Sequence, residues 1–239
     1  MSSKIQLAVT IPVYNEADII GVVISNWTTE LNKLSINYEI HVYNDGSTDN
    51  TLSILTRLAE YNKHLHIHDK LNEGHGPTLL AGYRENIINC EWLFQIDSDN
   101  EMPADEFFKL WERRKEFDLL VGLRSGRQQS FVRKIVSLVS RFMIRIFYKK
   151  AIFDVNSPYR LFNSEKFRDI IFLLPKSTLT PNVILSGVAG LYNLRCKEIL
   201  IKHQNRKTGQ TTNLIKILRM SFKAFWQVII FRFRLKKLV

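Results

Sequence analysis

The feature that most constrains the fold is the alternation of short apolar runs with longer amphipathic segments in the first half of the chain. Helices of ordinary length fit most of the intervals between these runs. Strands that alternate with helices at such spacing form a mostly parallel sheet with right-handed crossovers. The sequence therefore predicts an α/β fold with a central sheet flanked by helices. The expected strands cover residues 7–13, 38–43, 65–68, 91–96 and 119–121.

The chain is long enough to form such a sheet with a full core. It has 239 residues, of which 45% are hydrophobic and 24% charged, as in ordinary globular proteins. Cys90 and Cys196 have no disulfide or metal-ligand spacing, so we expect reduced thiols in a cytosolic protein. The first residues lead directly into a strand-like run, and we expect no secretory signal.

Polar side chains and turn residues follow the expected strands at their carboxyl ends. In open parallel sheets, ligands bind outside these ends. The sequence therefore predicts a binding site at this edge of the sheet. The segments concerned are residues 14–16, 45–47, 72–76 and 97–101.

The fourth strand ends in an acidic segment, Phe-Gln-Ile-Asp-Ser-Asp-Asn-Glu at residues 94–101. Its carboxylates belong to Asp97, Asp99 and Glu101. Three hard oxygen ligands at the end of a strand suit Mg²⁺ or Mn²⁺ and leave positions for substrate phosphates. The alternative is a solvated acidic loop, and the other motifs at the same edge favour a metal site.

The order of motifs in the first hundred residues resembles the family 2 glycosyltransferases. The motifs are Pro12-Val13-Tyr14-Asn15-Glu16, Asp45-Gly46-Ser47-Thr48-Asp49 and Asp97-Ser98-Asp99. The resemblance implies a nucleotide-sugar-binding α/β fold of the GT-A type. Asn44 stands where the family usually has an acid, and His75 where it often has a basic residue near the diphosphate.

Later segments resemble one branch of that family, the dolichyl-phosphate mannose synthases and related polyprenyl-phosphate hexose transferases. The resemblance covers about residues 7–215. Thr180-Pro181-Asn182 departs from the mannose synthases, which usually have a glutamate there. The matching segments are Gly122-Leu123-Arg124, Arg133 to Ser137, Asp154 to Arg160 and Arg206 to Thr211.

The resemblance implies a donor site and a metal site. Tyr14 would stack on the base or ribose, Glu16 would accept from ribose hydroxyls, and Asp45 would accept from a base N–H. Asp99 and Glu101 would be direct metal ligands, and Asp97 would face the sugar or a bound water. The donor site would also contain Pro12, Asn15, Gly74, Asp97 and Ser98.

The resemblance also implies an acceptor-phosphate site formed by Arg124, Arg133, Ser137 and Arg160. Arg133 and Ser137 are one helical turn apart, so they can grip one phosphate together. Arg206 would clamp the diphosphate or the acceptor phosphate from a lid loop.

Asp154 has two possible roles, and with Asp97, Asp99 and Arg206 it completes the expected catalytic set. It is either a general base or a residue that orients Arg160 or a sugar hydroxyl. A lipid phosphate is already ionised near neutral pH and needs no base, whereas a hydroxyl acceptor does. The arginine set favours the orienting role.

The positive charge points to an anionic partner. The net charge is +11, and residues 124–150 and 199–239 contain basic residues but no acidic one. No nucleic-acid-binding module is recognisable, so phosphorylated substrates or anionic lipids are the expected partners. His64, His66, His68 and His203 show no metal-like pattern, and we expect structural or surface roles for them.

Residues 214–239 are expected to form a basic amphipathic helix at a membrane surface, and residues 135–152 resemble it more weakly. The longest uncharged run, 224–231, is far short of the roughly 20 residues that span a bilayer. Packing on the protein's own core, an oligomer interface or a membrane-protein partner are the alternatives. The expected polar stripe is Lys216, Arg219, Lys223, Gln227, Arg234 and Lys237, opposite Leu214, Leu218, Phe222, Phe225 and Ile229.

The sequence thus predicts an inverting glycosyltransferase that uses Mg²⁺ or Mn²⁺ and a UDP- or GDP-linked sugar. The acceptor would be a polyprenyl phosphate at the cytoplasmic face of a membrane. The main alternative is transfer to a sugar hydroxyl of a lipid-linked or surface polysaccharide with Asp154 as base, and a second is a non-catalytic scaffold. The catalytic domain would cover residues 1–213, with a donor half to about 122 and an acceptor half from 123, followed by the helix at 214–239.

Overall fold

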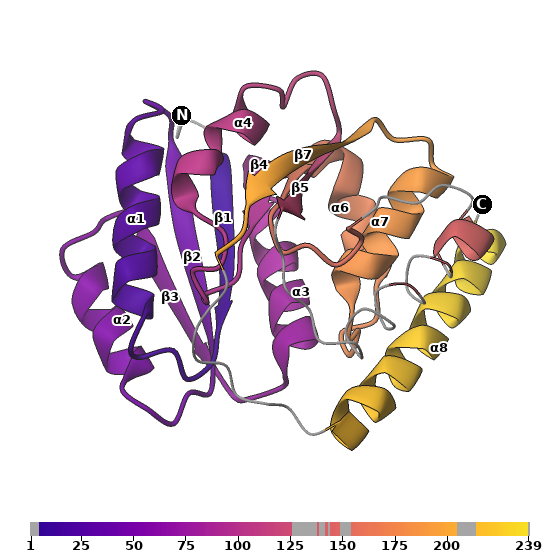
Figure 1. The fold of residues 1–239 in the computed structure, drawn as a ribbon, viewed down its shortest axis with the longest axis horizontal. Helices are drawn as coiled ribbons and strands as arrows, with labels where there is room; N and C mark the ends of the chain where they lie inside the picture. The colour runs from indigo at the N-terminus through magenta and orange to yellow at the C-terminus, as the bar shows by residue number, and fades with distance from the viewer. Residues whose placement is uncertain are drawn as a thin grey trace.

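The computed structural model describes residues 5–125, 138, 142, 144–148, 154–204 and 214–238, and for 214–218, 220 and 236–238 it describes only the backbone. One sheet runs through the molecule in the order β3-β2-β1-β4-β6-β5-β7 (Figure 1). All neighbouring strands are parallel except β6, which is antiparallel to both β4 and β5. The strands are β1 (Ile5–Val13), β2 (Tyr38–Asp45), β3 (Leu65–Lys70), β4 (Cys90–Gln95), β5 (Leu119–Ser125), β6 (Arg160–Asn163) and β7 (Cys196–Lys202).

Helices cover both faces of the sheet, which confirms the predicted α/β fold. One face packs against the first two helices and α4, around Trp27, Phe94 and Phe107. The other face packs against α3, α6 and α7, and α8 lies outside α7 (Figure 1). The helices are α1 (Ile20–Asn32), α2 (Thr51–Ala59), α3 (His75–Asn86), α4 (Phe108–Trp111), α6 (Ser164–Leu173), α7 (Pro181–Leu191) and α8 (Leu214–Leu238).

Strand β1 lies in the middle of the donor half and is buried on both faces. Leu7, Val9 and Ile11 are fully buried against the α1 side. On the opposite side, α3 approaches so closely that a Cβ on Gly82 would lie 2.5 Å from the Thr10 side chain. This close packing fixes the start of α3 relative to the carboxyl ends of β1 and β2.

Two expectations about secondary structure were incomplete or wrong. Pro103, a residue favoured at the first position of a helix, predicts a helix from there to about residue 115, but the structure forms a 3₁₀ turn, η1 (Ala104–Glu106), followed by the four-residue helix α4. Leu110 and Trp111 are held in the core, and the chain must then turn within a few residues to enter β5. The antiparallel strand β6 was not predicted, and it begins at Arg160, the last residue of a segment that we interpreted as a ligand-binding motif.

Helix α8 packs against the protein's own core along one side. Val228, Phe231 and Leu235 are buried in the core cluster that includes α7. Gln227, which we placed in the polar stripe, accepts from the Leu179 N–H at 2.8 Å and donates to the Ser177 carbonyl at 2.9 Å. That placement was therefore wrong, because this side of α8 faces the loop before α7.

Candidate active site

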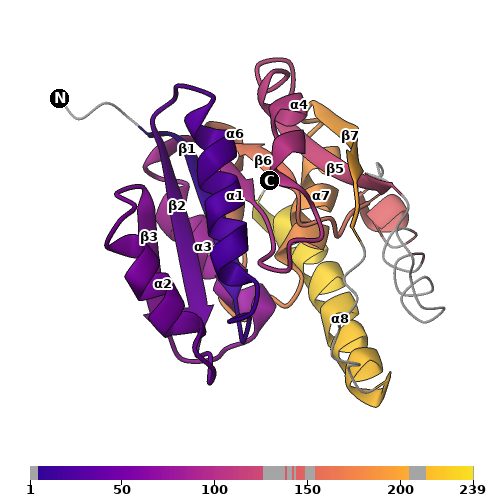
Figure 2. The same ribbon diagram turned by 60° about the vertical axis from the view of Figure 1, so that its left-hand side comes forward.

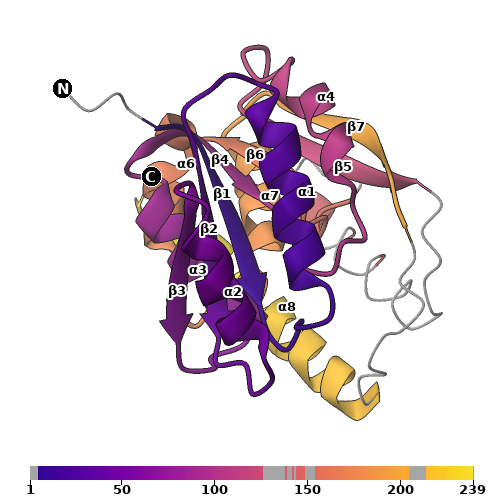
Figure 3. The same cartoon turned by 90° about the vertical axis from the view of Figure 1, so that its left-hand side faces the viewer.

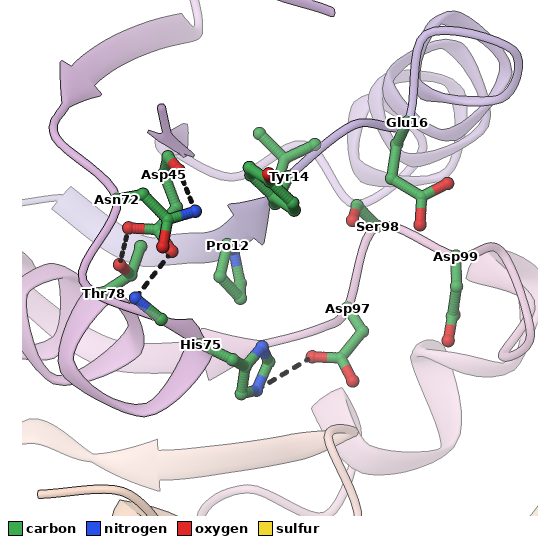
Figure 4. Close-up of a pocket in the computed structure, with 12 residues that line it drawn as sticks. Pro12, Tyr14, Glu16, Asp45, Asn72, His75, Thr78, Asp97, Ser98 and Asp99 are labelled. Atoms are coloured by element: carbon green, nitrogen blue, oxygen red, sulfur yellow. Dashed lines mark hydrogen bonds and ion pairs between the residues drawn. The ribbon is translucent and has the colours of Figure 1, made fainter. Parts of the chain in front are cut away.

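A cleft of about 360 Å³ opens at the carboxyl ends of β1, β2 and β4 (Figure 4). It forms where three strand-end loops and the first turn of α3 meet. The structure therefore brings most of the expected donor residues together, and adds Asn72, His75 and Thr78 to them. The expected residues that line the cleft are Pro12, Tyr14, Glu16, Asp45, Gly74, Asp97, Ser98 and Asp99.

The first two sequence motifs hold each other in place at the cleft. The Asn15 N–H donates to Ser47 Oγ at 3.0 Å, and its side-chain oxygen accepts from the Thr48 N–H at 2.8 Å. Asn15 adopts a positive φ of 53°, which reverses the chain. Tyr14, just before this turn, is about half exposed at the cleft. Asn15 thus fixes the turn that presents Tyr14.

Asp45 organises the loop that leads into α3. One carboxylate oxygen accepts from Lys70 Nζ at 3.0 Å, Thr78 Oγ1 at 2.6 Å and the Glu73 N–H at 2.9 Å. The other oxygen accepts from the Gly74 N–H at 2.9 Å. Burial raises the pKa of Asp45, but these hydrogen bonds outweigh it and keep the pKa below the usual value. The ionised carboxylate can still accept from a ligand on its second oxygen.

Carboxylates crowd the end of the cleft beyond β4. Burial, and then the nearby charges of Asp97, Glu101 and Glu16, raise the pKa of Asp99 to about 7. Figure 4 shows Asp99 on the side of Glu16, whereas Asp97 points toward His75, whose Nε2 is 3.8 Å from Asp97 Oδ1. Like charges gathered this closely fit a cation, because a cation would offset their repulsion.

The expected set of three metal ligands is not arranged around one point. Within the described part of the chain, no group of three or more His, Cys, Asp or Glu side chains is positioned to hold a metal ion. Glu101 Oε2 instead lies 3.0 Å from Nε2 of His203. The Gln204 N–H also donates to the Glu101 carbonyl at 2.8 Å. The segment that follows β7 is therefore joined to the acidic loop.

The contact between His203 and the acidic loop is one that sequence reasoning missed. The His203 side chain is almost fully buried, and it contacts a carboxylate that lies 102 positions earlier in the chain. We expected a structural or surface histidine because it has no metal-like partner nearby in the sequence. In the sequence, its position directly after the last strand was the only sign that it could lie near the acidic loop.

A buried amide network orients Asp97. Gln95 Nε2 donates to Asp97 Oδ1 at 3.1 Å, and Gln95 Oε1 accepts from Tyr83 Oη at 2.9 Å and Asn182 Nδ2 at 2.8 Å. Asn182 belongs to the segment that departs from the mannose synthases. Gln95 therefore links Asn182, where this chain differs from the mannose synthases, to Asp97 in the acidic loop.

The expected acceptor residues are in different environments. Arg124 donates to both oxygens of Asp154 at 2.8 Å, and this pair is largely buried. Arg160 is fully buried, and it donates to the carbonyls of Val155, Ser157 and Asn182 and to Ser186 Oγ.

Arg160 therefore stabilises the protein interior, and its assignment to the acceptor-phosphate site was wrong. Asp154 does not orient Arg160, because its carboxylate is bound to Arg124. Burial lowers the pKa of Arg160 to about 10, which still leaves it charged at neutral pH. Arg133, Ser137 and Arg206 lie outside the described residues.

Comparisons with known proteins agree with this geometry. The model of a family described as "Glycosyl transferase family 2" matches residues 8–171. An undecaprenyl-phosphate 4-deoxy-4-formamido-L-arabinose transferase of Serratia proteamaculans is 27% identical over 91% of this chain and 66% of its own length. The protein of the same name from Yersinia enterocolitica is 26% identical over 92% and 67%. This chain spans about two thirds of the length of these relatives.

Solved structures share the fold at low sequence identity. Glucosyl-3-phosphoglycerate synthase from Mycobacterium tuberculosis, in complex with Mn²⁺, UDP-glucose and phosphoglyceric acid, has a TM-score of 0.66 at 16% identity, over 95% of this chain and 79% of that one. Mannosyl-3-phosphoglycerate synthase from Rubrobacter xylanophilus has a TM-score of 0.68 at 13% identity, over 98% and 76%. These likenesses support the GT-A fold.

The described residues contain no helix that is both long enough and apolar enough to span a bilayer.

Proposed function

This chain belongs to glycosyl transferase family 2, and from that premise we propose that it transfers a sugar from a UDP- or GDP-linked donor to a polyprenyl phosphate, with inversion at the anomeric carbon. The observation that carries the proposal is the cleft at the carboxyl ends of β1, β2 and β4, where a tyrosine, a fixed aspartate and an acidic loop meet. The curated relatives, whose name states an undecaprenyl-phosphate acceptor, support the lipid phosphate.

The donor would lie along the cleft with its nucleoside toward Tyr14 and Asp45. Tyr14 is exposed enough to stack on the base or ribose, and Asp45 has an oxygen that can accept from the base. Glu16 would accept from ribose hydroxyls. His75 lies between Asp45 and the acidic loop, so it is placed to face the diphosphate (Figure 4).

Asp97 and Asp99 would hold Mg²⁺ or Mn²⁺, and Glu101 would join them directly or through water. The crowded carboxylates and the raised pKa of Asp99 fit this role. A divalent cation there would offset the charge that develops on the departing nucleoside diphosphate. Gln95 would keep Asp97 oriented through its hydrogen bond.

The Arg124–Asp154 pair favours a phosphate acceptor over a hydroxyl acceptor. A general base must take a proton from the nucleophile, but both oxygens of Asp154 already accept hydrogen bonds from the Arg124 guanidinium. An ionised phosphate needs no base and can attack the anomeric carbon directly. We propose that this transfer takes place at the cytoplasmic face of a membrane, where such an acceptor would lie.

The acceptor class can be tested with a matched pair of short lipids, a polyprenyl phosphate and the corresponding polyprenol. We expect glycosylation of the phosphate and none of the alcohol. Glycosylation of the alcohol, or of a saccharide hydroxyl in preference to the phosphate, would refute the proposed acceptor and favour Asp154 as a base.

A further inference from the structure

We propose that the outward face of α8 is a docking surface for an anionic phospholipid bilayer, and that it inserts a stripe of large apolar side chains between the headgroups. We name this stripe the α8 outer stripe. It consists of Phe222, Trp226, Ile230 and Phe233, all of which are exposed. The proposal deepens the proposed function, because a lipid acceptor would be reached from that surface.

Helical geometry places the α8 outer stripe opposite the buried side of the helix. Its members are four, four and three residues apart, so they lie on one face. Val228, Phe231 and Leu235, which are buried against the core, lie on the opposite face. Gln227 and Arg232 add hydrogen bonds from α8 to the Ser177, Leu179 and Phe147 backbone. The core contacts therefore fix which face of α8 points outward.

Charge complementarity favours anionic lipid as the occupant. Arg219, Lys223 and Arg234 are exposed on the same side of α8, between or beside the apolar side chains. Residues 199–239 contain no acidic residue. Basic residues around an apolar stripe with a tryptophan are typical of helices that lie in the bilayer interface. A second copy of the chain fits less well, because pairing this face with itself would bring like charges together.

The position of α8 agrees with a role beside the catalytic cleft. Figures 1, 2 and 3 differ only by rotation about the vertical axis, and in each of them the N-terminal end of α8 is below the carboxyl ends of β1 and β2. Figures 2 and 3 show this half of α8 projecting from the body. The helix thus extends past the edge of the sheet where the cleft opens.

A neighbouring helical segment also exposes large apolar side chains. Phe142 and Ile146 are exposed, one helical turn apart. This segment contacts α8 where Tyr148 Oη donates to the Val228 carbonyl at 2.9 Å. Exposed apolar side chains on two adjoining segments are typical of an interaction site, whereas single scattered ones are ordinary.

The test is vesicle binding without donor or acceptor, using phosphatidylcholine vesicles and vesicles that also contain phosphatidylglycerol. We expect co-sedimentation with the anionic vesicles only. Trp226 is a built-in reporter, because Trp27, Trp92 and Trp111 are buried whereas Trp226 is 48% exposed. Brominated lipid should quench the fluorescence of bound wild-type protein but have little effect on Trp226→Phe.

Paired substitutions separate the apolar and the charged contributions. Phe222→Ser with Phe233→Ser should weaken binding by at least about tenfold, since each ring loses its burial in the bilayer. Arg219→Gln with Lys223→Gln should weaken it by about fivefold for each residue. Arg57→Gln with Tyr61→Ser is the matched control, because both side chains are exposed on the other side of the sheet. It should bind like wild type.

Several results would contradict the proposal that this face of α8 docks on a bilayer. They are equal binding to both kinds of vesicle, Trp226 fluorescence that brominated lipid does not quench, or full binding by the variant with Phe222→Ser and Phe233→Ser. A dimer that this variant dissociates, without any vesicle binding, would identify a second copy as the occupant. Sugar transfer to a short soluble polyprenyl phosphate is measured separately, so loss of docking can be distinguished from failure of the proposed function.

Discussion

Replacing Asp154 by Asn tests whether this residue is a buried ion-pair partner or a general base. In the wild-type protein, Arg124 Nε and one of its terminal nitrogens each donate to Asp154 at 2.8 Å. The Arg124 side chain is only 7% exposed. Asn keeps the shape but loses the charge and one of the two acceptor oxygens, so the guanidinium is left largely buried without a counter-charge.

The expected loss of stability follows from this geometry. Removing one partner of a fully buried pair costs about 3–5 kcal/mol, and partial exposure of Asp154 reduces this to about 2–3 kcal/mol. In a protein of this size, each kcal/mol lowers Tm by about 2–4 °C, so we expect a decrease of about 5–10 °C. The free energy of unfolding from urea titration gives the same quantity independently.

A double-mutant cycle isolates the pair. Asp154→Asn, Arg124→Gln and the double variant should show a coupling free energy of about 2 kcal/mol. Asp118→Asn is a matched control outside the cleft, because Asp118 also accepts from an arginine, Arg195, but that arginine is mostly exposed. Its Tm should fall less.

Activity distinguishes the two roles of Asp154. With a polyprenyl phosphate acceptor and at temperatures well below Tm, Asp154→Asn should retain kcat to within about tenfold, whereas loss of a general base costs about 10²–10⁴-fold. An unchanged Tm combined with a kcat loss of that size would refute the reasoning and make Asp154 the base.

Three further predictions concern the donor, the acidic loop and acid stability. Tyr14→Ala should raise KM for the nucleotide sugar by about tenfold or more with little change in kcat, because stacking contributes to binding; an unchanged KM in steady-state kinetics would contradict this. His203→Ala should weaken Mn²⁺ binding by about 10-fold or more in a titration followed by electron paramagnetic resonance, and wild-type affinity would show that Glu101 needs no such support. Burial raises the pKa of Asp118, but hydrogen bonds and charge from Arg195 outweigh burial and keep the pKa below its usual value. The ionised Asp118 therefore stabilises the fold at pH values above the usual pKa of an aspartate, and this contribution is lost as the pH falls through the lowered pKa. Asp118→Asn should therefore lower Tm at pH 7 but not in strong acid, and an equal decrease at both pH values would be inconsistent with the ion pair.

The sheet and the cleft could be predicted because their signals are local. The apolar run at 91–96 and the acidic residues after it lie in one short stretch, and strand-end loops of a parallel sheet meet at one edge. Tyr14, Asp45 and Asp99 therefore line one cleft, as we expected from sequence.

Contacts between distant residues could not be predicted in this way. The His203–Glu101 contact and the Asn182–Gln95 hydrogen bond each join residues more than 80 positions apart, and neither leaves a local pattern. Arg160 was misassigned because an arginine within a ligand-like motif resembles a binding residue. Its burial became apparent only once β6 was placed between β4 and β5.

The orientation of α8 shows a different limit of sequence analysis. Both sides of this helix contain large apolar residues, so a helical projection does not distinguish the inward side from the outward side. Phe222 and Trp226 are exposed, whereas Val228 and Phe231 are buried. Packing against the core decided the orientation.

The most direct test of the central claim is mass spectrometry of the products formed by wild-type protein and Asp99→Asn. Each protein is incubated with Mg²⁺ or Mn²⁺, a panel of UDP- and GDP-sugars and a short polyprenyl phosphate. We predict that wild-type protein forms a monoglycosyl polyprenyl phosphate from one donor, that chelation of the metal abolishes it, and that Asp99→Asn loses at least about 10²-fold in rate. Undiminished transfer by Asp99→Asn, or transfer by wild-type protein only to saccharide hydroxyls, would contradict the account.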